Sequence, residues 1–349
     1  MKMPKVYFLV HMLLSFLFGQ PEFHQYIHGG IERDYILYRP ECAQNQSPLI
    51  FVFHGYTGTA NGIMEYSNMN SIADTNCFTV CYPQGIVDDY NNTFFNVGYS
   101  FHWNESVDDV EFIISLAEHL QNEYNLSTIN TFTTGMSNGG DFSYLLSCQE
   151  STKFKAAAPI AGVMMEWIFD TCFPENPIPI LEIHGTNDNV SWWNGDIEDS
   201  GGWGPYMDVD TTIQFWSEIN LCSHIEIDTL NDMNTQDGSY VITEKYTQGI
   251  MNHEVWLYKI VNGGHDWPGA WGNMDIIASE VIWQFFDHFK LDYSIGDIDY
   301  NGSIDVIDLL IISDGVIENS YYNFISDFNN DNINDINDIY ALLTFILGY

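Results

Sequence analysis

Basic residues are scarce in this chain: 9 Lys and Arg stand against 48 Asp and Glu in 349 residues, for a formal net charge of −39 at pH 7. A surface of this sign repels nucleic acid and anionic membranes, so neither is expected as a partner. Beyond residue 20 the chain also lacks a segment apolar enough to cross a bilayer, for which about 20 consecutive apolar residues are needed. Disorder is excluded too, because 46% of the residues are hydrophobic and 15% aromatic, enough to bury a sizeable core.

Residues 1–20 are predicted to be a secretory signal peptide. Lys2 and Lys5 make a charged start, and the apolar run Val6–Phe18 is too short to span a membrane. No cysteine follows the run where a lipid anchor would be attached. The mature protein is therefore expected to be secreted and extracellular, with no membrane insertion.

No Cys/His zinc pattern is present among the cysteines. Six of them follow the signal segment: Cys42, Cys77, Cys81, Cys148, Cys172 and Cys222. An even count in an exported chain favours disulfides. The spacing leaves the pairing open, and a buried free thiol remains the alternative for any one of them.

Residues 21–290 are predicted to form one domain of alternating strands and helices. The helix at Asp109–Tyr124 has apolar residues at helical spacing, and Asp275–Phe289 is the closing helix. Strands that are apolar on both faces indicate a mostly parallel sheet covered by helices on both sides, which is an α/β fold. The predicted strands are Ile31–Tyr38, Pro48–Phe53, Phe78–Tyr82, Ala156–Ala161, Ile178–Ile183 and Val255–Ile260.

A nucleophile motif lies near the middle of the chain, where residues 129–141 read I-N-T-F-T-T-G-M-S-N-G-G-D. A β-branched run breaks at Gly135-Met136-Ser137-Asn138-Gly139, and a helical pattern follows. G-x-S-x-G between a strand and a helix is typical of the sharp turn that exposes the serine of an α/β-hydrolase. The flanking glycines are expected because a Cβ there would collide with neighbouring backbone. Ser137 is therefore the predicted nucleophile, which would attack a carbonyl carbon.

A serine nucleophile needs a base to take its proton and an acid to orient that base. The α/β-hydrolase order of serine, acid and histidine is satisfied by Ser137, Asp188 and His265. Asp188 follows the apolar strand that ends in Gly185, and His265 follows the strand that ends at Ile260. Such folds carry their functional groups beyond the carboxyl ends of strands, where both residues are predicted to lie.

Other residues compete for these two roles. Asp196 and Asp199 are rival acids in the same loop region, whereas Glu182 is a poor rival because it sits inside a strand. For the chosen aspartate, the structural alternative is a turn or helix cap. His184 is interpreted as a strand-end structural residue and His119 as a helix-surface residue.

The tetrahedral intermediate of ester hydrolysis needs N–H donors for its oxyanion. The predicted donors are the backbone N–H groups of Asn138, directly after the nucleophile, and of Tyr56, in the loop after His54-Gly55. His54 is predicted to brace that loop.

These motifs belong to a longer ordered set. The set reads His54-Gly55, Tyr82-Pro83-Gln84-Gly85, Asp108-Asp109-Val110-x-Phe112-Ile113, Gly135-Met136-Ser137-Asn138-Gly139-Gly140, His184-Gly185-Thr186-x-Asp188 and Gly263-Gly264-His265-x-Trp267-Pro268-Gly269. Together the motifs resemble the secreted polyhydroxybutyrate depolymerase/feruloyl esterase family, related to carbohydrate esterase family 1, over about residues 25–290. The resemblance implies a serine esterase with Ser137, Asp188 and His265 as its triad. Tyr56 departs from the family, where many relatives have a cysteine, so backbone donation is expected to survive but the family's local disulfide pattern is in doubt.

Tryptophans in the predicted loops are candidates for substrate contacts. Trp103, Trp192 and Trp267 are assigned to substrate binding, since an indole could stack on a feruloyl ring, a sugar face or a polyester chain. Ordinary hydrophobic packing is the alternative for each. Trp193, Trp203 and Trp271 occupy similar loop positions.

Composition changes near residue 291, after which there is no Lys or Arg and Asp and Asn dominate. Two aligned loops, 297–308 and 327–338, each precede an apolar helical stretch, so residues 291–349 are predicted to form a separate module with an internal repeat. Oxygen ligands at loop positions 1, 3, 5, 7, 9 and 12 are the spacing that encloses Ca²⁺, and two structural ions are expected. The predicted ligands are Asp297, Asp299, Asn301, Ser303, Asp305 and Asp308, then Asp327, Asn329, Asp331, Ile333, Asp335 and Asp338, with backbone carbonyls at position 7.

Tandem loops of this kind at the C-terminus of a secreted hydrolase resemble a type I dockerin. The resemblance implies a small all-α module, Ca²⁺-dependent folding and docking onto a cohesin-bearing scaffold protein. Val306-Ile307 and Ile336-Asn337 depart from the family, because many dockerins place a hydroxyl pair at these loop positions. A contact within the chain or with another protein is therefore the alternative.

The leading hypothesis is an exported carboxylic-ester hydrolase that removes feruloyl or acetyl groups from plant or algal polysaccharide, with no cofactor for catalysis. The dockerin-like module favours polysaccharide over polyester, and a polyhydroxybutyrate depolymerase is the alternative within the class. The alternative from another class is a catalytically idle binding module with a hydrolase fold. The complete triad argues against that alternative.

Overall fold

The computed structural model describes residues 19–291, 295–299, 303–318, 325–329 and 333–348. The predicted signal peptide lies outside these ranges except for its last two residues. The chain divides into two compact units, Met1–Phe289 and Lys290–Tyr349, which are described separately below. No helix in the described ranges is both long and apolar enough to cross a bilayer.

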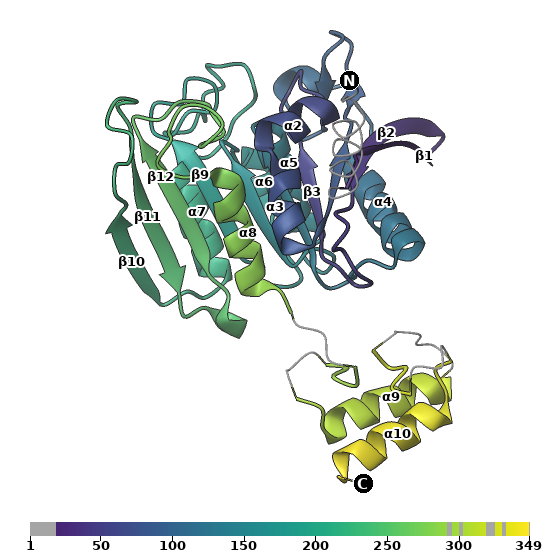
Figure 1. The fold of residues 1–349 in the computed structure, drawn as a ribbon. Helices are drawn as coiled ribbons and strands as arrows, with labels where there is room; N and C mark the ends of the chain where they lie inside the picture. The colour runs from purple at the N-terminus through teal and green to yellow at the C-terminus, as the bar shows by residue number, and fades with distance from the viewer. Residues whose placement is uncertain (1–18, 292–294, 300–302, 319–324, 330–332, 349) are drawn as a thin grey trace, which may run out of the picture. The chain divides into compact units, whose positions relative to one another are not determined.

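The N-terminal unit is built on one large sheet whose strand order is β1-β2-β4-β3-β7-β8-β9-β12-β11-β10 (Figure 1). The six central strands, from β4 to β12, pair in parallel, while the two strands at each edge pair antiparallel. The mostly parallel sheet predicted from the sequence is therefore confirmed. The strands are β1 Glu22–His28, β2 Ile31–Tyr38, β3 Leu49–Phe53, β4 Thr79–Pro83, β7 Thr131–Met136, β8 Ala156–Ile160, β9 Ile180–Gly185, β10 His224–Thr229, β11 Tyr240–Thr247 and β12 Val255–Val261; β5 Ile86–Val87 and β6 Thr93–Phe94 form a separate small ribbon.

Helices cover both faces of the sheet, so successive side chains of a central strand enter different cores. In β3, Leu49, Phe51 and Phe53 join one buried cluster, whereas Ile50 and Val52 join the other. Residues of α4, α5, α6 and α7 complete the first cluster, and residues of α2, α3 and α8 complete the second. The helices are α2 Ala60–Ser67, α3 Met69–Asn76, α4 Asp109–Tyr124, α5 Asn138–Gln149, α6 Glu166–Thr171, α7 Val209–Ile219 and α8 Ala278–Phe289, with short 3-10 turns at Ser100–His102 and Ile250–Asn252.

The predicted elements of the central sheet are confirmed, several with their bounds. The predicted strand at Ile31–Tyr38 and the predicted helix at Asp109–Tyr124 match β2 and α4 at both ends. The side chain of Asp108 caps α4 by accepting from the Glu111 N–H at 2.9 Å. The closing helix begins later than predicted, at Ala278.

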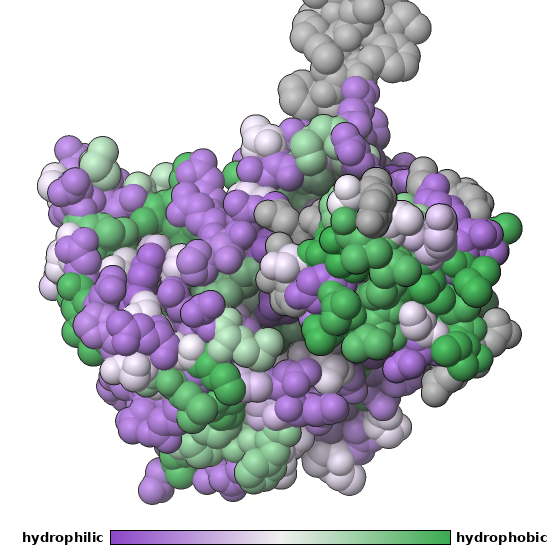
Figure 2. All heavy atoms as spheres, turned by 90° about the horizontal axis from the view of Figure 1, so that it is seen from below, coloured by the Kyte–Doolittle hydropathy of each residue, from purple (hydrophilic) through white to green (hydrophobic). Residues whose placement is uncertain are grey.

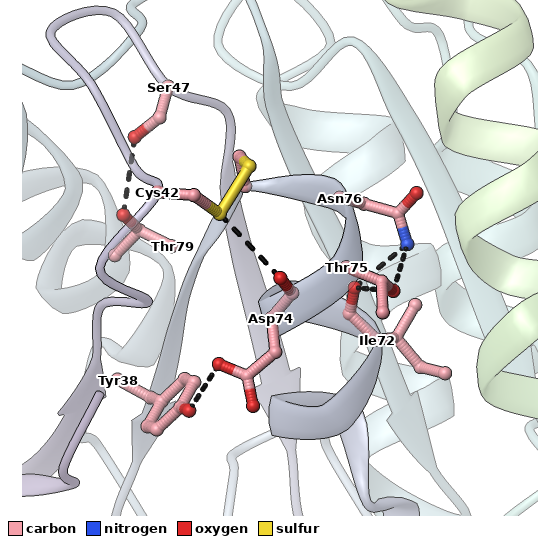
Figure 3. Close-up of a disulfide and its surroundings, with 9 residues drawn as sticks. Tyr38, Cys42, Ser47, Ile72, Asp74, Thr75, Asn76 and Thr79 are labelled. Atoms are coloured by element: carbon pink, nitrogen blue, oxygen red, sulfur yellow. Dashed lines mark hydrogen bonds between the residues drawn. A yellow bond between two sulfur atoms is a disulfide. The ribbon is translucent and has the colours of Figure 1, made fainter. Parts of the chain in front are cut away.

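One disulfide, between Cys42 and Cys77, ties the loop after β2 to the end of α3 (Figure 3). A side-chain hydrogen bond joins the same two elements, because the Tyr38 hydroxyl donates to Asp74 Oδ1 at 2.6 Å. The edge of the sheet is therefore held to its covering helix both covalently and by a polar contact.

A second disulfide, between Cys148 and Cys172, joins the last turn of α5 to the residue that ends α6. Cys81, buried in β4, and Cys222 are free thiols. The six cysteines therefore form two disulfides and leave two free thiols.

The C-terminal unit contains two helices, α9 Val306–Glu318 and α10 Ile336–Ile346, each preceded by one of the acidic loops. The two loop segments are paired, because the Gly296 N–H donates to the Ile325 carbonyl at 2.9 Å. The rings of Phe328 and Phe345 pack at 5.5 Å between centroids. Among the described residues of this unit, the buried apolar side chains are Ile298, Ile312, Ile325 and Leu342.

Candidate active site

Ser137 lies on the tight turn between β7 and α5. Its backbone has φ 57° and ψ −123°, a conformation that costs an L-residue energy and that persists only where the surrounding structure enforces it. The turn is closed on both sides, since the Ser137 N–H donates to the Ile160 carbonyl at 2.9 Å and the Asp141 N–H donates to the Ser137 carbonyl at 2.9 Å. The sharp strand-to-helix turn expected from the motif is present.

The glycines of the motif permit a close crossing of backbones. A Cβ on Gly135 would lie 2.7 Å from the carbonyl oxygens of Gly139 and Phe53, and a Cβ on Gly139 would collide with the Phe53 carbonyl. A Cβ on Gly140 would lie 2.9 Å from Gly162 Cα. Side chains at these positions would push α5 off the sheet, so the glycines set the height at which the serine stands.

Asp188 and His265 meet although 77 residues separate them. His265 Nδ1 lies 2.7 Å from Asp188 Oδ2, while Asp188 Oδ1 accepts the N–H groups of Val190 and Ser191 at 2.8 and 2.9 Å. The carboxylate is buried and can only accept, so Nδ1 of His265 carries the proton and Nε2 is left as the basic nitrogen.

The three predicted triad residues follow strands of the same sheet at the same edge. Ser137 follows β7, Asp188 follows β9 and His265 follows β12, and these parallel strands lie close together in the sheet. Ser137 also shares the lining of one pocket with Val190 and Ser191, which flank the Asp188 turn. A larger cavity of about 740 Å³ near β1 and β2 contains none of the triad residues, so it is not the place of the predicted chemistry.

The two predicted oxyanion donors come from different segments, the start of α5 and the loop after β3. Asn138 is the first residue of α5, where a backbone N–H has no acceptor within its helix. Its side-chain amide is fixed by paired hydrogen bonds with the backbone of Phe95, at 2.8 and 2.9 Å. Tyr56 lies in the loop after β3, and Gly55 beside it approaches Ser137 so closely that a Cβ there would lie 3.3 Å from the serine Cβ.

Two hydrogen bonds fix the side chain of Tyr56, and neither involves the backbone N–H that is the predicted oxyanion donor. Its hydroxyl donates to Asp88 Oδ2 at 2.7 Å and accepts from Asn92 Nδ2 at 2.7 Å. Burial, together with the Asp88 bond, raises the pKa of Tyr56 to about 12, so the phenol stays protonated and keeps donating. His54 braces the same loop, because its Nδ1 bonds the Gly55 carbonyl at 2.8 Å and its Nε2 accepts the Gly85 N–H at 2.9 Å.

Glu182 and His184 form a buried polar network behind the aspartate. His184 Nδ1 lies 2.9 Å from Glu182 Oε1, and its Nε2 lies 2.8 Å from the Ser191 carbonyl and 3.6 Å from Asp188 Oδ2. The Tyr144 hydroxyl donates to the other Glu182 oxygen at 2.9 Å. Burial raises the pKa of Glu182 to about 7. His184 thus supports the turn that presents Asp188, as its interpretation as a structural residue requires.

The rival acids Asp196 and Asp199 hold a loop in place. Asp196 accepts the N–H groups of Ser200 and Gly201 at 2.9 and 2.7 Å. Asp199 accepts the Gly204 N–H at 2.7 Å and the Ser100 hydroxyl at 2.8 Å. The carboxylates of Asp196 and Asp199 therefore stabilise the loop that contains Trp203, whereas Asp188 is the acid that bonds His265.

The structure corrects one predicted substrate contact and places a tryptophan that was not assigned to substrate binding in the pocket of Ser137. Trp267 is 1% exposed and its Nε1 donates to Ser279 Oγ at 3.1 Å, so it is a core residue and cannot bind substrate. Trp103 is 85% exposed, and Trp192 is partly buried with its Nε1 on the Asn189 carbonyl. Trp203 instead lines the pocket that contains Ser137. Its position between two glycines was the only sequence signal, and that signal marks a loop without giving the direction of the ring.

The acidic loops of the C-terminal unit place predicted calcium ligands together. Oxygen atoms of Asp297, Asp299 and Asp308 lie within 4.8 Å of one another, a spread that a single ion with Ca–O distances of about 2.3–2.6 Å can bridge. Asp308 closes its loop by accepting the N–H groups of Ile298 and Asp305 at 2.6 and 2.8 Å.

The second loop repeats this arrangement. Asp338 accepts the N–H groups of Asn329 and Asp335 at 3.0 and 2.9 Å. Asp335 and Asp338 also form the capping box of α10. The predicted ligands Asn301 and Asp331 lie outside the described residues. Among the described residues, the donor set is made of hard oxygen ligands, which fits Ca²⁺.

Comparisons with known proteins bear on the class of reaction. The family model described as Esterase PHB depolymerase matches residues 33–171, a segment that includes Ser137 but ends before Asp188 and His265. A bifunctional acetylxylan esterase/xylanase of Neocallimastix patriciarum is 29% identical over 161 residues, covering 46% of this chain and 22% of that protein. A probable feruloyl esterase C of Aspergillus niger is 28% identical over 181 residues, covering 49% of this chain and 61% of that protein. These matches support a carboxylic-ester hydrolase.

The solved structure of an acetyl xylan esterase from Aspergillus awamori superposes with a TM-score of 0.54 at 13% identity, over 76% of this chain and 99% of that one. A likeness at this identity shows the α/β-hydrolase fold alone. The chain spans less than two thirds of the length of the curated relatives it matches. The substrates in the names of those relatives therefore describe those proteins alone.

Proposed function

We propose that this chain is a secreted serine carboxylic-ester hydrolase that removes feruloyl or acetyl groups from plant or algal polysaccharide. One observation carries the proposal: Ser137 stands on a strained turn at the same sheet edge where His265 and Asp188 form a 2.7 Å hydrogen bond. Strain of this kind is retained at functional sites, and this turn follows a strand of the same sheet whose nearby strands lead to the acid and the base. The family match and the esterase relatives support the same reaction class.

In the proposed acylation step, His265 acts first as a base and then as an acid. Nε2 of His265 takes the proton from Ser137 Oγ, which attacks the ester carbonyl carbon. The N–H groups of Asn138 and Tyr56 stabilise the oxyanion that forms. His265 then gives its proton to the departing alkoxide, which leaves as the alcohol, and Asp188 stabilises the imidazolium between these transfers. The acyl group remains on the serine.

Deacylation repeats the sequence with water. Nε2 of His265 takes a proton from a water molecule, whose oxygen attacks the acyl carbon. The proton then returns to Ser137 Oγ as the carboxylic acid leaves. The reaction needs no metal or organic cofactor, because serine, histidine and backbone donors supply every proton transfer and charge contact.

The same reaction class contains a second candidate substrate. The matching family model is named for polyhydroxybutyrate depolymerase, which favours a polyester as the alternative. A binding module without activity is the candidate from another class. The intact hydrogen bond between Asp188 and His265 argues against it.

Product release by purified protein separates these candidates. Wild type and Ser137→Ala would be incubated with acetylated xylan, feruloylated arabinoxylan and polyhydroxybutyrate, with acetate, ferulate and hydroxybutyrate measured. Acetate or ferulate release that Ser137→Ala lacks supports the polysaccharide esterase. Hydroxybutyrate release alone moves the protein to the depolymerase branch, and equal release by both proteins contradicts the proposed nucleophile.

For the C-terminal unit we propose a calcium-dependent, dockerin-like docking module. The clustered oxygens of Asp297, Asp299 and Asp308 support metal binding. Apolar side chains gathered on the surface of α9 and α10 support a protein partner such as a cohesin (Figure 2). In the part of this unit that the structure describes, the large exposed apolar residues are Ile295, Val306, Ile307, Leu310, Ile317, Ile333, Ile336, Tyr340, Leu343, Phe345 and Leu347.

Chelation tests the metal part of this proposal. All ten tryptophans lie before residue 290, so tryptophan fluorescence reports on the N-terminal unit alone. Removal of Ca²⁺ should open the C-terminal unit to proteolysis and leave the fluorescence unchanged. Equal proteolysis of the C-terminal unit with and without chelator contradicts the proposal. Secretion is supported by the two disulfides, which persist in oxidising compartments.

A further inference from the structure

The proposed site has two neighbouring pockets of very different size, separated by Trp203. The pocket that contains Ser137, here called the inner pocket, has a volume of about 10 Å³, room for roughly one water molecule. The pocket on the other side of Trp203, here called the outer pocket, has a volume of about 320 Å³. A substrate held at Ser137 therefore has little space on one side and much more on the other.

The inner pocket is bounded by side chains that hydrogen bonds or burial hold in place. Asp141 lies beneath it, fully buried, and accepts the Tyr99 hydroxyl and the Val163 N–H, each at 2.6 Å. Burial raises the pKa of Asp141 to about 7. The Tyr206 hydroxyl accepts the Trp192 N–H at 3.1 Å. Enlarging this pocket would break buried hydrogen bonds, so it remains small when a substrate binds.

The outer pocket has aromatic walls. The rings of Tyr56, Phe101 and Trp203 lie 5.6 to 5.8 Å apart between centroids, and Tyr90 stands 6.3 Å from Phe101. Gly202, which also lines the pocket, has open space where its Cβ would be. Flat apolar walls of this kind suit a planar ring or the apolar face of a sugar.

Trp203 is fixed between the two pockets. Its carbonyl accepts the Ser100 N–H at 3.1 Å, and its loop is pinned by Asp196 and Asp199 as described above. The indole itself packs against the rings of Tyr99 and Tyr56, at 5.3 and 5.7 Å between centroids, so it forms a partition between the two pockets.

Each candidate substrate has a different pair of groups flanking the ester bond. A feruloyl group on polysaccharide has a bulky aromatic acyl group on one side and a sugar on the other. Polyhydroxybutyrate has chain on both sides. An acetyl group on polysaccharide has a methyl group on one side and a sugar on the other, which is the only one of these pairs that matches one small and one large pocket.

We infer that the site selects acetyl esters of polysaccharide, with the acetyl methyl group in the inner pocket and the sugar ring against the aromatic wall of the outer pocket. This inference rests on the proposed function. Val163 and Tyr206 would limit acyl length, and Trp203 would both close the inner pocket and contact the sugar. No residue beyond the proposed triad takes part in proton transfer.

An acyl-length series tests the inner pocket. The substrates would be the acetate, butyrate and hexanoate of 4-methylumbelliferone, whose ring is too large for the inner pocket and must occupy the outer one. We expect kcat/KM to fall at least about tenfold from acetate to hexanoate, since one or two methylenes in a tight pocket change specificity by about that factor. In Val163→Ala the ratio of butyrate to acetate hydrolysis should rise several-fold. A flat or rising series in wild type overturns the inference.

Trp203→Ala tests the outer pocket, with Trp271→Ala as the matched control because Trp271 is highly exposed and lines neither pocket. Trp203→Ala should lower kcat/KM for an acetylated xylo-oligosaccharide at least about tenfold more than kcat/KM for ethyl acetate, which meets the indole only in the inner pocket. Trp271→Ala should leave both values within about twofold. Equal losses on both substrates in Trp203→Ala would contradict a sugar contact.

The natural substrates separate failure of this inference from failure of the proposed function. Wild type should release acetate from acetylated xylan at least about tenfold faster than ferulate from feruloylated arabinoxylan. Faster ferulate release overturns the acetyl selection and leaves the serine esterase intact. Absence of hydrolysis of every ester, together with absence of covalent labelling at Ser137 by a fluorophosphonate, overturns both.

Discussion

Replacing Ser137 with glycine should stabilise the folded protein while abolishing catalysis. The φ of 57° and ψ of −123° at this residue are readily adopted by glycine but cost an L-residue about 1–3 kcal/mol. Glycine also adds freedom to the unfolded chain, which offsets about 0.5–1 kcal/mol of that gain. Ser137→Gly should therefore be about 1–2 kcal/mol more stable than Ser137→Ala, which keeps the strained Cβ but also lacks the hydroxyl.

The assay is urea unfolding at 25 °C followed by tryptophan fluorescence, which reports on the N-terminal unit. Ser143 is the matched control, because it lies in the interior of α5. Its hydroxyl donates to the Gly139 carbonyl at 2.9 Å. There the order should reverse, with Ser143→Gly about 1 kcal/mol less stable than Ser143→Ala. If Ser137→Gly is no more stable than Ser137→Ala, the turn is not strained and the structural argument for this nucleophile fails.

Three further predictions address the surroundings of the site. Gly139→Ala should lower the unfolding free energy by more than about 2 kcal/mol and abolish esterase activity, because its Cβ meets the Phe53 carbonyl; wild-type urea stability would contradict the close crossing. The pKa of Asp141 is about 7 in the folded protein against an ordinary value of 3.8, so the folded state holds a proton that the unfolded chain releases. As the pH rises from 4 to 8, the unfolding free energy of wild type should therefore fall by up to about 4 kcal/mol relative to that of Asp141→Asn. Urea midpoints of the two proteins that stay parallel across this range would refute the shift. Replacing both Cys148 and Cys172 with serine should cost about 3 kcal/mol, since their bridge closes a loop of 24 residues; an unchanged unfolding free energy in non-reducing buffer would show that the bridge does not constrain the unfolded chain.

The central strands and the nucleophile turn were predictable because their signals are local. A central strand such as β3 is a short apolar run, β7 is a run rich in β-branched residues, and the turn at Ser137 needs glycines that the sequence displays. Of the antiparallel strands at the two edges, β2 was predicted, whereas β1, β10 and β11 were not. Every residue of β10 is exposed, so no buried apolar pattern marks that strand, and it is held by pairing with β11.

Side-chain direction accounts for the errors near the site. Trp267 stands two residues from His265 in the motif Gly263-Gly264-His265-x-Trp267-Pro268-Gly269, yet its ring turns into the core and bonds Ser279. Trp203 lies in a loop held by Asp196 and Asp199, contacts that join residues of one loop in ways no periodicity reveals. The spacing of a motif indicates where a backbone passes, whereas the direction of a ring depends on packing partners far away in the sequence.

Covalent labelling of Ser137 tests the proposed serine esterase most directly. The full chain would be treated with a fluorophosphonate, digested and analysed by mass spectrometry, with Ser137→Ala and Asp188→Asn in parallel. We expect one phosphonate adduct on the peptide that contains Ser137, none in Ser137→Ala, and labelling at least about a hundredfold slower in Asp188→Asn because His265 loses its orienting acid. An unlabelled wild-type protein, or an adduct on another serine, would contradict the proposed nucleophile.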